Sequence, residues 1–172
     1  MRLPKIIHMS RKRRDRDQRG LVIVESAIVL AALLLMLMAM IESGNIFMTW
    51  LTTQRAAEYG ARFASTGQGE IEGTRDTDII RVTREAMKAL PDYLAKTTVE
   101  VRNWPSRSPL GESDEGGGTP CNLVEVEARY AYEFITPVAG LAAIFDGVIP
   151  TTLSIKAMDR QVNEPWLPCD DT

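Results

Sequence analysis

The hydrophobic pattern begins with an unbroken apolar run over residues 21–41, in which Glu25 is the one charged residue. As an α-helix this run is about 32 Å long, which is enough to cross the hydrocarbon core of a membrane. A cleaved secretory signal has an apolar region of only about 7–15 residues and ends in a small-x-small site. Residues 42–44 (Glu-Ser-Gly) provide no Ala-x-Ala site. The run therefore predicts a retained transmembrane helix.

The helical pattern continues beyond the membrane segment. Over residues 45–65, apolar positions recur at steps of three and four, with polar residues between them: Ile46, Phe47, Trp50, Leu51, Ala57 and Phe63. This spacing predicts a single helix over residues 21–65, whose second half is amphipathic and packs on a folded domain. Gly44 and Gly60 are points where such a helix can bend. Residues 66–69 (Thr-Gly-Gln-Gly) are expected to end it.

Farther along the chain the period changes from helical to alternating. A second helix is expected over residues 76–94, with Pro91 ending or kinking it. Alternating apolar and polar residues then predict three strands, over residues 98–104, 124–134 and 151–162. Residues 105–120 are rich in Gly, Pro and Ser and are expected to form a long mobile loop. Residues 136–145 fit either a short helix or an apolar loop.

These elements together predict an α+β fold, in which a long N-terminal transmembrane and amphipathic helix packs on a small antiparallel sheet. Three strands with one apolar face need a cover, and the amphipathic half of the helix supplies it. The expected organisation has four parts: a basic leader (1–20), the transmembrane helix (21–41), its extension (42–66) and an α+β domain (67–172).

Charge is distributed unevenly along the chain. Residues 1–20 carry a net charge of +6, whereas the remaining residues carry −9. Because positive charge beside a transmembrane helix stays in the cytoplasm, the N-terminus is expected inside and the acidic domain outside. Basic runs such as residues 11–14 also occur in nucleic-acid-binding proteins. Here the run adjoins a membrane segment, so membrane topology explains it and no nucleic-acid partner is expected.

The candidate chemistry of the outer domain is limited by its lack of histidine, since His8 lies in the leader. The domain therefore has no Ser-His-Asp or Cys-His arrangement and no histidine-containing metal site. Carboxylates such as Asp76, Asp78 and Asp114 lie in solvated sequence, at the start of a predicted helix or in a loop. We expect no enzymatic activity, no catalytic residue, no metal site and no cofactor.

Cys121 and Cys169 both lie on the expected outer side of the membrane. Two thiols in an oxidising compartment usually pair, so a disulfide is expected, although two free thiols are the alternative. The bridge would join the second strand to the C-terminal tail. Closing such a loop stabilises a fold by about 4 kcal/mol in the chain-entropy model.

Glu25 is the residue that most needs explanation, because a carboxylate inside a transmembrane segment is costly and usually functional. It lies five residues after Gly20, where the charged leader meets the apolar run. The sequence Arg-Gly-Leu-Val-Ile-Val-Glu over residues 19–25 resembles the class III signal of type IV pilins and pseudopilins. The resemblance implies that a prepilin peptidase cuts after Gly20 and leaves Leu21 as the mature N-terminus. Glu25 would then neutralise the new amino group of a neighbouring subunit and set the helix register; the alternative is a Glu that reaches headgroup water.

A longer stretch of the helix is similar to the TadE-like family of the tight-adherence (Tad or Flp) pilus systems. The matching residues fall in three blocks: Arg19-Gly20-x4-Glu25-x-Ala27-x3-Ala31-x-Leu33-Leu34-Leu35, Ile41-Glu42-x-Gly44-x-x-Phe47, and Gln54-Arg55-Ala56-Ala57-Glu58-Tyr59-Gly60-Ala61-Arg62. Two features differ from the major Flp pilin, which is far shorter and has Tyr where this chain has Ser26. The resemblance therefore implies a minor, pilin-like subunit and not the main filament subunit.

The function implied by the resemblance is that of a minor pseudopilin required for assembly of a Tad pilus. It would reside in the bacterial inner membrane as a single-pass protein, with its C-terminal domain in the periplasm, or enter the pilus itself. The expected partners are other Tad pseudopilins, the major Flp pilin, the prepilin peptidase and the inner-membrane assembly platform. The alternative is an unprocessed, membrane-anchored periplasmic domain for binding or cell adhesion.

Overall fold

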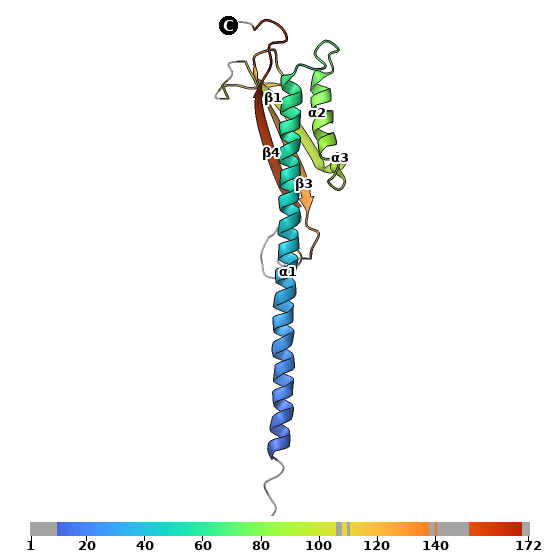
Figure 1. Cartoon of the computed structure of the whole chain (residues 1–172), viewed down its shortest axis with the longest axis vertical. Helices are drawn as coiled ribbons and strands as arrows, with labels where there is room; N and C mark the ends of the chain where they lie inside the picture. Colours follow the sequence, from blue (N-terminus) through green and yellow to red (C-terminus); the bar gives the residue numbers. More distant parts are fainter. Residues whose placement is uncertain (1–9, 106–107, 110, 138–139, 141–151, 170–172) are drawn as a thin grey trace, which may run out of the picture.

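The structure is a computed structural model, and it describes residues 10–105, 108–109, 111–137, 140 and 152–169. In Figure 1 the helix α1 (Ser10–Ser65) runs from the lower end of the molecule to its upper end. The sheet and the shorter helices pack against its upper part, and the lower part projects away from them. The molecule is therefore a shaft that carries a small domain at one end.

Helix α1 is continuous over 56 residues, and neither Gly44 nor Gly60 interrupts it. It ends where the sequence indicates, at Ser65, and tight turns follow in which the amides of Thr66 and Gly67 bond to carbonyls three residues earlier. Gly67 has a φ of 68°, the left-handed conformation in which glycine commonly ends helices. The predicted C-terminal end of this helix is confirmed.

The second helix is shorter than the sequence predicts. Helix α2 spans Arg75–Ala86, and the separate short helix α3 spans Tyr93–Lys96. The expectation of one helix over residues 76–94 was therefore wrong. The amides of Met87 and Leu90 bond to carbonyls three residues earlier, so the chain leaves the α-helical pattern before Pro91. A proline lacks the amide donor and clashes with the carbonyl four residues before it, which explains why the helix ends a turn early.

Within the described residues, four strands form one antiparallel sheet in the order β2–β1–β3–β4. The strands are β1 (Thr97–Trp104), β2 (Asp114–Glu115), β3 (Leu123–Glu133) and β4 (Thr152–Val162). The three long strands lie where alternation predicted them. Strand β2 was missed, because two exposed acidic residues in a Gly-rich segment give no alternating pattern. The expectation for residues 136–145 falls largely outside the described residues.

The core lies between α1 and the apolar face of the sheet, and α2 covers the rest of that face beside α1. Alternate residues of β3 point inward, as the sequence predicts, and are buried: Val124, Val126, Ala128, Tyr130 and Tyr132. They pack against small residues of α1 that are fully buried: Ala56, Ala57, Ala61 and Ala64. Small side chains on the helix allow its backbone to approach the sheet closely. The expected α+β fold is confirmed.

Candidate functional site

The lower part of α1 is the first component of the candidate site. Among the described residues, one helix is long and apolar enough to cross a membrane, and its most apolar part is not buried against the rest of the chain. The large side chains from Leu21 to Ile41 are exposed along this shaft, except for the half-buried Met38. An exposed apolar surface of this length requires lipid or other apolar helices around it.

Gly20, Leu21 and Glu25 lie within two helical turns of one another, where the apolar part of α1 begins. Gly20 is exposed, and a side chain added there would meet nothing within 4 Å. Glu25 lies one helical turn beyond Leu21, on a side of α1 where its neighbours are Ser26 and the apolar residues Val29, Leu30 and Leu33. No ion pair to Glu25 occurs among the residues whose placement the structure gives. The carboxylate is therefore available to a partner outside this chain.

Glu42, directly after the apolar run, has a structural role in the domain that its spacing in the sequence does not indicate. Its side chain is 4% exposed, although it carries a charge. The Tyr132 hydroxyl donates to Oε1 at 2.6 Å, the Ile135 amide donates to Oε1 at 3.2 Å, and the Thr136 amide donates to Oε2 at 2.8 Å. These bonds connect the end of β3 to α1 at the end of the apolar run. We call these four residues the Glu42 junction.

The Glu42 junction also determines the ionisation of its members. Burial alone would raise the pKa of Glu42, but hydrogen bonds from Thr136, Tyr132 and Ile135 outweigh burial and hold the pKa below its ordinary value. Burial raises the pKa of Tyr132, and its hydrogen bond to the Glu42 carboxylate raises it further. Glu42 is therefore an acceptor of three hydrogen bonds and Tyr132 remains a donor at neutral pH.

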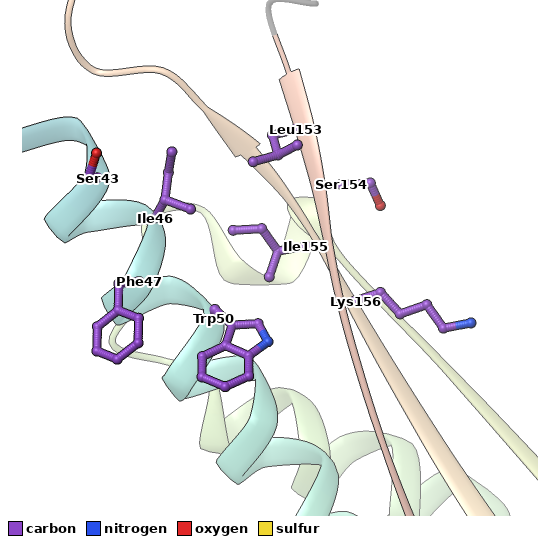
Figure 2. Close-up of a pocket in the computed structure, with 8 residues that line it drawn as sticks. All are labelled: Ser43, Ile46, Phe47, Trp50, Leu153, Ser154, Ile155 and Lys156. Carbon is purple, nitrogen blue, oxygen red and sulfur yellow. The ribbon is translucent and has the colours of Figure 1, made fainter. Parts of the chain in front are cut away.

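Just above the junction, a groove of about 460 Å³ opens between α1 and β4. Figure 2 shows Ile46, Phe47 and Trp50 on the helix, with Leu153 and Ile155 directed toward it from the strand, whereas Ser154 and Lys156 point away. The Phe47 and Trp50 rings stack with centroids 5.9 Å apart, and both rings are exposed. We call this cavity the α1–β4 groove.

Helix α1 is uncharged for several turns above the Glu42 junction. Residues 43–54 contain no Asp, Glu, Lys or Arg. Because Glu42 is buried in its own domain, the helix presents no exposed charge from Ser26 to Gln54. That length is about 42 Å, which exceeds the roughly 30 Å of a hydrocarbon core. The apolar surface of α1 therefore extends past the membrane segment onto the folded domain.

The other face of the sheet carries a two-layered network of charges. The carboxylates of Glu125 and Glu127 lie at the bottom, with side chains only 4% and 2% exposed. Arg160 Nε lies 2.6 Å from Glu125 Oε2, and Lys156 Nζ lies 2.7 Å from Glu127 Oε2. Arg129 also pairs with Glu127. The long basic side chains cover these two acids, and Arg129, Lys156 and Arg160 expose 39%, 45% and 44% of their side chains.

The end of the domain distant from the membrane segment is held by Arg75, which is 4% exposed. Its guanidinium donates to the carbonyls of Ala64 at 2.8 Å and Gly117 at 3.0 Å, pairs with Glu70 at 3.1 Å, and lies 4.6 Å from the Trp166 ring centroid. The Arg75 side chain thus joins four parts of the chain: the end of α1, the start of α2, the loop at Gly117 and the C-terminal tail. No sequence pattern marks this role.

The two cysteines lie at the same distant end. The structure joins Cys121 to Cys169, with Cα atoms 5.8 Å apart, in agreement with the pairing expected from the sequence. The tail is also held by the Glu164 amide, which donates to the Ser65 carbonyl at 2.8 Å. The cysteines are therefore far from Gly20, Leu21 and Glu25, which lie at the opposite end of the shaft. In the described part of the chain, no group of three or more potential metal ligands occurs.

The chain matches one of the protein-family models with which it was compared at its N-terminal helix. The model of a family described as TadE-like protein matches residues 20–62. The matched segment begins at Gly20 and includes Glu25, Glu42 and the helical side of the α1–β4 groove, but none of the sheet. No curated protein and no solved structure matches the chain.

Proposed function

We propose that this chain is a TadE-like protein of Tad pilus assembly and acts as a minor pseudopilin, processed by a prepilin peptidase after Gly20. The match of the TadE-like family model to residues 20–62 supports the proposal. The observation that carries the proposal is the arrangement of Gly20, Leu21 and Glu25 at the start of the apolar part of α1, whose surface is uncovered. The family match begins at the same glycine.

The chemistry of this segment suits a peptidase substrate that later joins an assembly. Gly20 has no side chain to obstruct an extended backbone in a protease, and glycine lowers the cost of unwinding the helix there. Cleavage would create a positive amino group on Leu21. A Glu25 carboxylate on a neighbouring subunit can neutralise that amino group, and because unpaired charge in lipid is penalised, the pair would set the axial register of adjacent helices.

The proposed location follows from the charge pattern and the exposed shaft. The chain would reside in the bacterial inner membrane with its basic leader in the cytoplasm and its domain in the periplasm. Its partners would be other Tad pseudopilins, the major Flp pilin and the inner-membrane platform, first contacted through α1. Ala27, Ala31 and Ala32 give this helix small side chains at which a second helix can approach closely.

Processing is tested by co-expressing the full chain with its prepilin peptidase and sequencing the mature N-terminus. We expect the mature chain to start at Leu21, and we expect Gly20→Ser to retain the leader. Gly44→Ser is the matched control, because this glycine lies in the same helix and an added side chain also meets nothing within 4 Å. An intact wild-type leader in this assay would reject the proposal and favour an unprocessed, membrane-anchored domain for binding or adhesion.

The role of Glu25 is tested separately from processing. Glu25→Ala should be cleaved as efficiently as the wild type, because the substitution lies beyond the cleaved bond, but it should reduce the number of surface pili several-fold. Glu58→Ala is the control, since Glu58 is an exposed glutamate on the same helix above the membrane segment. Normal piliation of the Glu25→Ala strain would show that charge pairing does not set the register.

A further inference from the structure

Strand β4 forms one edge of the sheet, and in the described residues no strand pairs with its outer side. It is 11 residues long, whereas the opposite edge ends in the two-residue β2. A long edge offers a row of backbone donors and acceptors to another chain. This edge lies beside the α1–β4 groove, so backbone pairing and apolar side-chain burial are available at the same place (Figure 2).

The two faces of β4 differ in what an added strand would meet. Leu153, Ile155 and Ala157 point toward α1, so side chains of an added strand on that face would enter the groove beside Phe47 and Trp50. On the other face, Lys156 and Arg160 expose 45% and 44% of their side chains. Within the sheet, these cations already pair with carboxylates of β3, their neighbouring strand. A strand on the other side of β4 would be complementary if it carried carboxylates too.

We propose that the β4 edge and the α1–β4 groove together bind an extended segment of a partner chain, in which apolar residues alternate with polar ones and carboxylates lie opposite Lys156 and Arg160. This strand addition would extend the sheet, and the groove would select the alternate apolar side chains. The face of β4 that carries Lys156 and Arg160 has no carboxylate to offer in a second copy. In the antiparallel register centred on Met158, a second copy would set Lys156 of each chain opposite Arg160 of the other. The charges therefore favour a different, acidic partner. The proposal is independent of processing at Gly20.

The test uses the full chain in lipid nanodiscs and the blocked peptide Ac-Glu-Thr-Thr-Val-Glu-Val-Thr-Val-amide, labelled for fluorescence anisotropy. Antiparallel to β4, its two Glu residues lie opposite Lys156 and Arg160, and its Val residues face the groove. We expect saturable binding and slower amide exchange over residues 152–162. Replacing both Glu residues by Lys should weaken binding at least about tenfold, as expected for charges placed beside like charges. N-methylation of alternate peptide amides should abolish binding, because it removes the backbone donors.

A protein variant tests the groove without disturbing the buried carboxylates. Trp50→Ala should lower the affinity for the peptide about tenfold. Tyr59→Ala removes another exposed aromatic side chain from α1 and should leave the affinity unchanged. Absence of binding, or equal binding of the acidic, basic and N-methylated peptides, would overturn the proposal. Protection of Phe47 and Trp50 alone, with β4 unchanged, would indicate a helix or lipid in the groove and would also overturn it, as would self-association of the chain through β4.

Discussion

Glu42 is the residue through which the folded domain holds the membrane helix. Its carboxylate accepts hydrogen bonds from one hydroxyl and two amides of the segment at the end of β3. Each such bond to a charged group contributes about 1.5–3 kcal/mol when its partner would otherwise remain unsatisfied. The junction lies directly after the apolar run of residues 21–41, so it fixes the end of β3 to α1 at that point.

The junction gives a prediction for Glu42→Gln. The amide cannot accept all three hydrogen bonds and brings its own donor toward a backbone amide, so we expect the junction to lose about 2 kcal/mol. Amide exchange of residues 132–136 should accelerate correspondingly. Glu58→Gln, at an exposed position of the same helix, should leave these amides unchanged. Unaltered protection in the Glu42→Gln protein would show that the carboxylate does not hold the junction.

The pH dependence of the junction follows from the same contacts. Because the folded state lowers the pKa of Glu42, the stabilisation is fully present above the ordinary value of 4.5 and is lost as the pH falls through the lowered pKa of the folded state. Other carboxylates, such as Glu127, also have lowered pKa values. The difference in free energy of unfolding between the wild type and Glu42→Gln therefore isolates the contribution of Glu42. That difference should be constant at neutral pH and shrink below about pH 4.5.

At the scale of elements, close contact between α1 and α2 depends on the absence of a side chain at Gly60. A Cβ there would overlap Thr83 Oγ1 and lie 3.1 Å from Val126 Cγ1. Thr83 is fully buried, and its hydroxyl donates to the Ile79 carbonyl at 2.7 Å, so it has no room to move aside. The glycine that the sequence marked as a bending point is therefore a packing position.

Two glycines of one helix should consequently respond in opposite ways to substitution by alanine. Gly60→Ala should destabilise the fold by about 1–3 kcal/mol, because the methyl group overfills the contact with α2. Gly44→Ala meets nothing within 4 Å and should stabilise the helix by up to about 1 kcal/mol, the difference in helix propensity. Thermal unfolding of the full chain, followed by near-ultraviolet circular dichroism, measures both. Equal effects of the two substitutions would contradict the packing role.

For the whole molecule, the sequence predicted features that depend on local periodicity and missed those that depend on distant contacts. The end of α1 and the three long strands follow from residue spacing. The Glu42 junction joins residues about 90 positions apart, and the burial of Glu127 depends on Lys156 from another strand. Neither contact leaves a periodic signal. At the candidate site, Gly20 and Glu25 were identified because their spacing is local, whereas the α1–β4 groove required the helix and strand to be placed together.

The orientation of the whole molecule can be measured with a matched pair of glutamine substitutions, made in the Cys121→Ser/Cys169→Ser background. Gln68→Cys lies in the exposed loop after α1 and should react with a membrane-impermeant maleimide on intact spheroplasts. Gln18→Cys lies in the basic leader, which is retained in cells that lack the prepilin peptidase. In those cells it should react only after the membrane is opened, because positive charge is retained in the cytoplasm. The reverse pattern of labelling would place the domain in the cytoplasm.

The most direct measurement of the central claim is the intact mass of the chain purified from the membranes of its own cells, compared with cells that lack the prepilin peptidase. In the presence of the peptidase, the chain should lack residues 1–20 and begin at Leu21. Without the peptidase, the mass should increase by that of the leader. A full-length chain in both cells, or a mature start at another residue, would contradict the assignment of this helix as a processed pseudopilin helix.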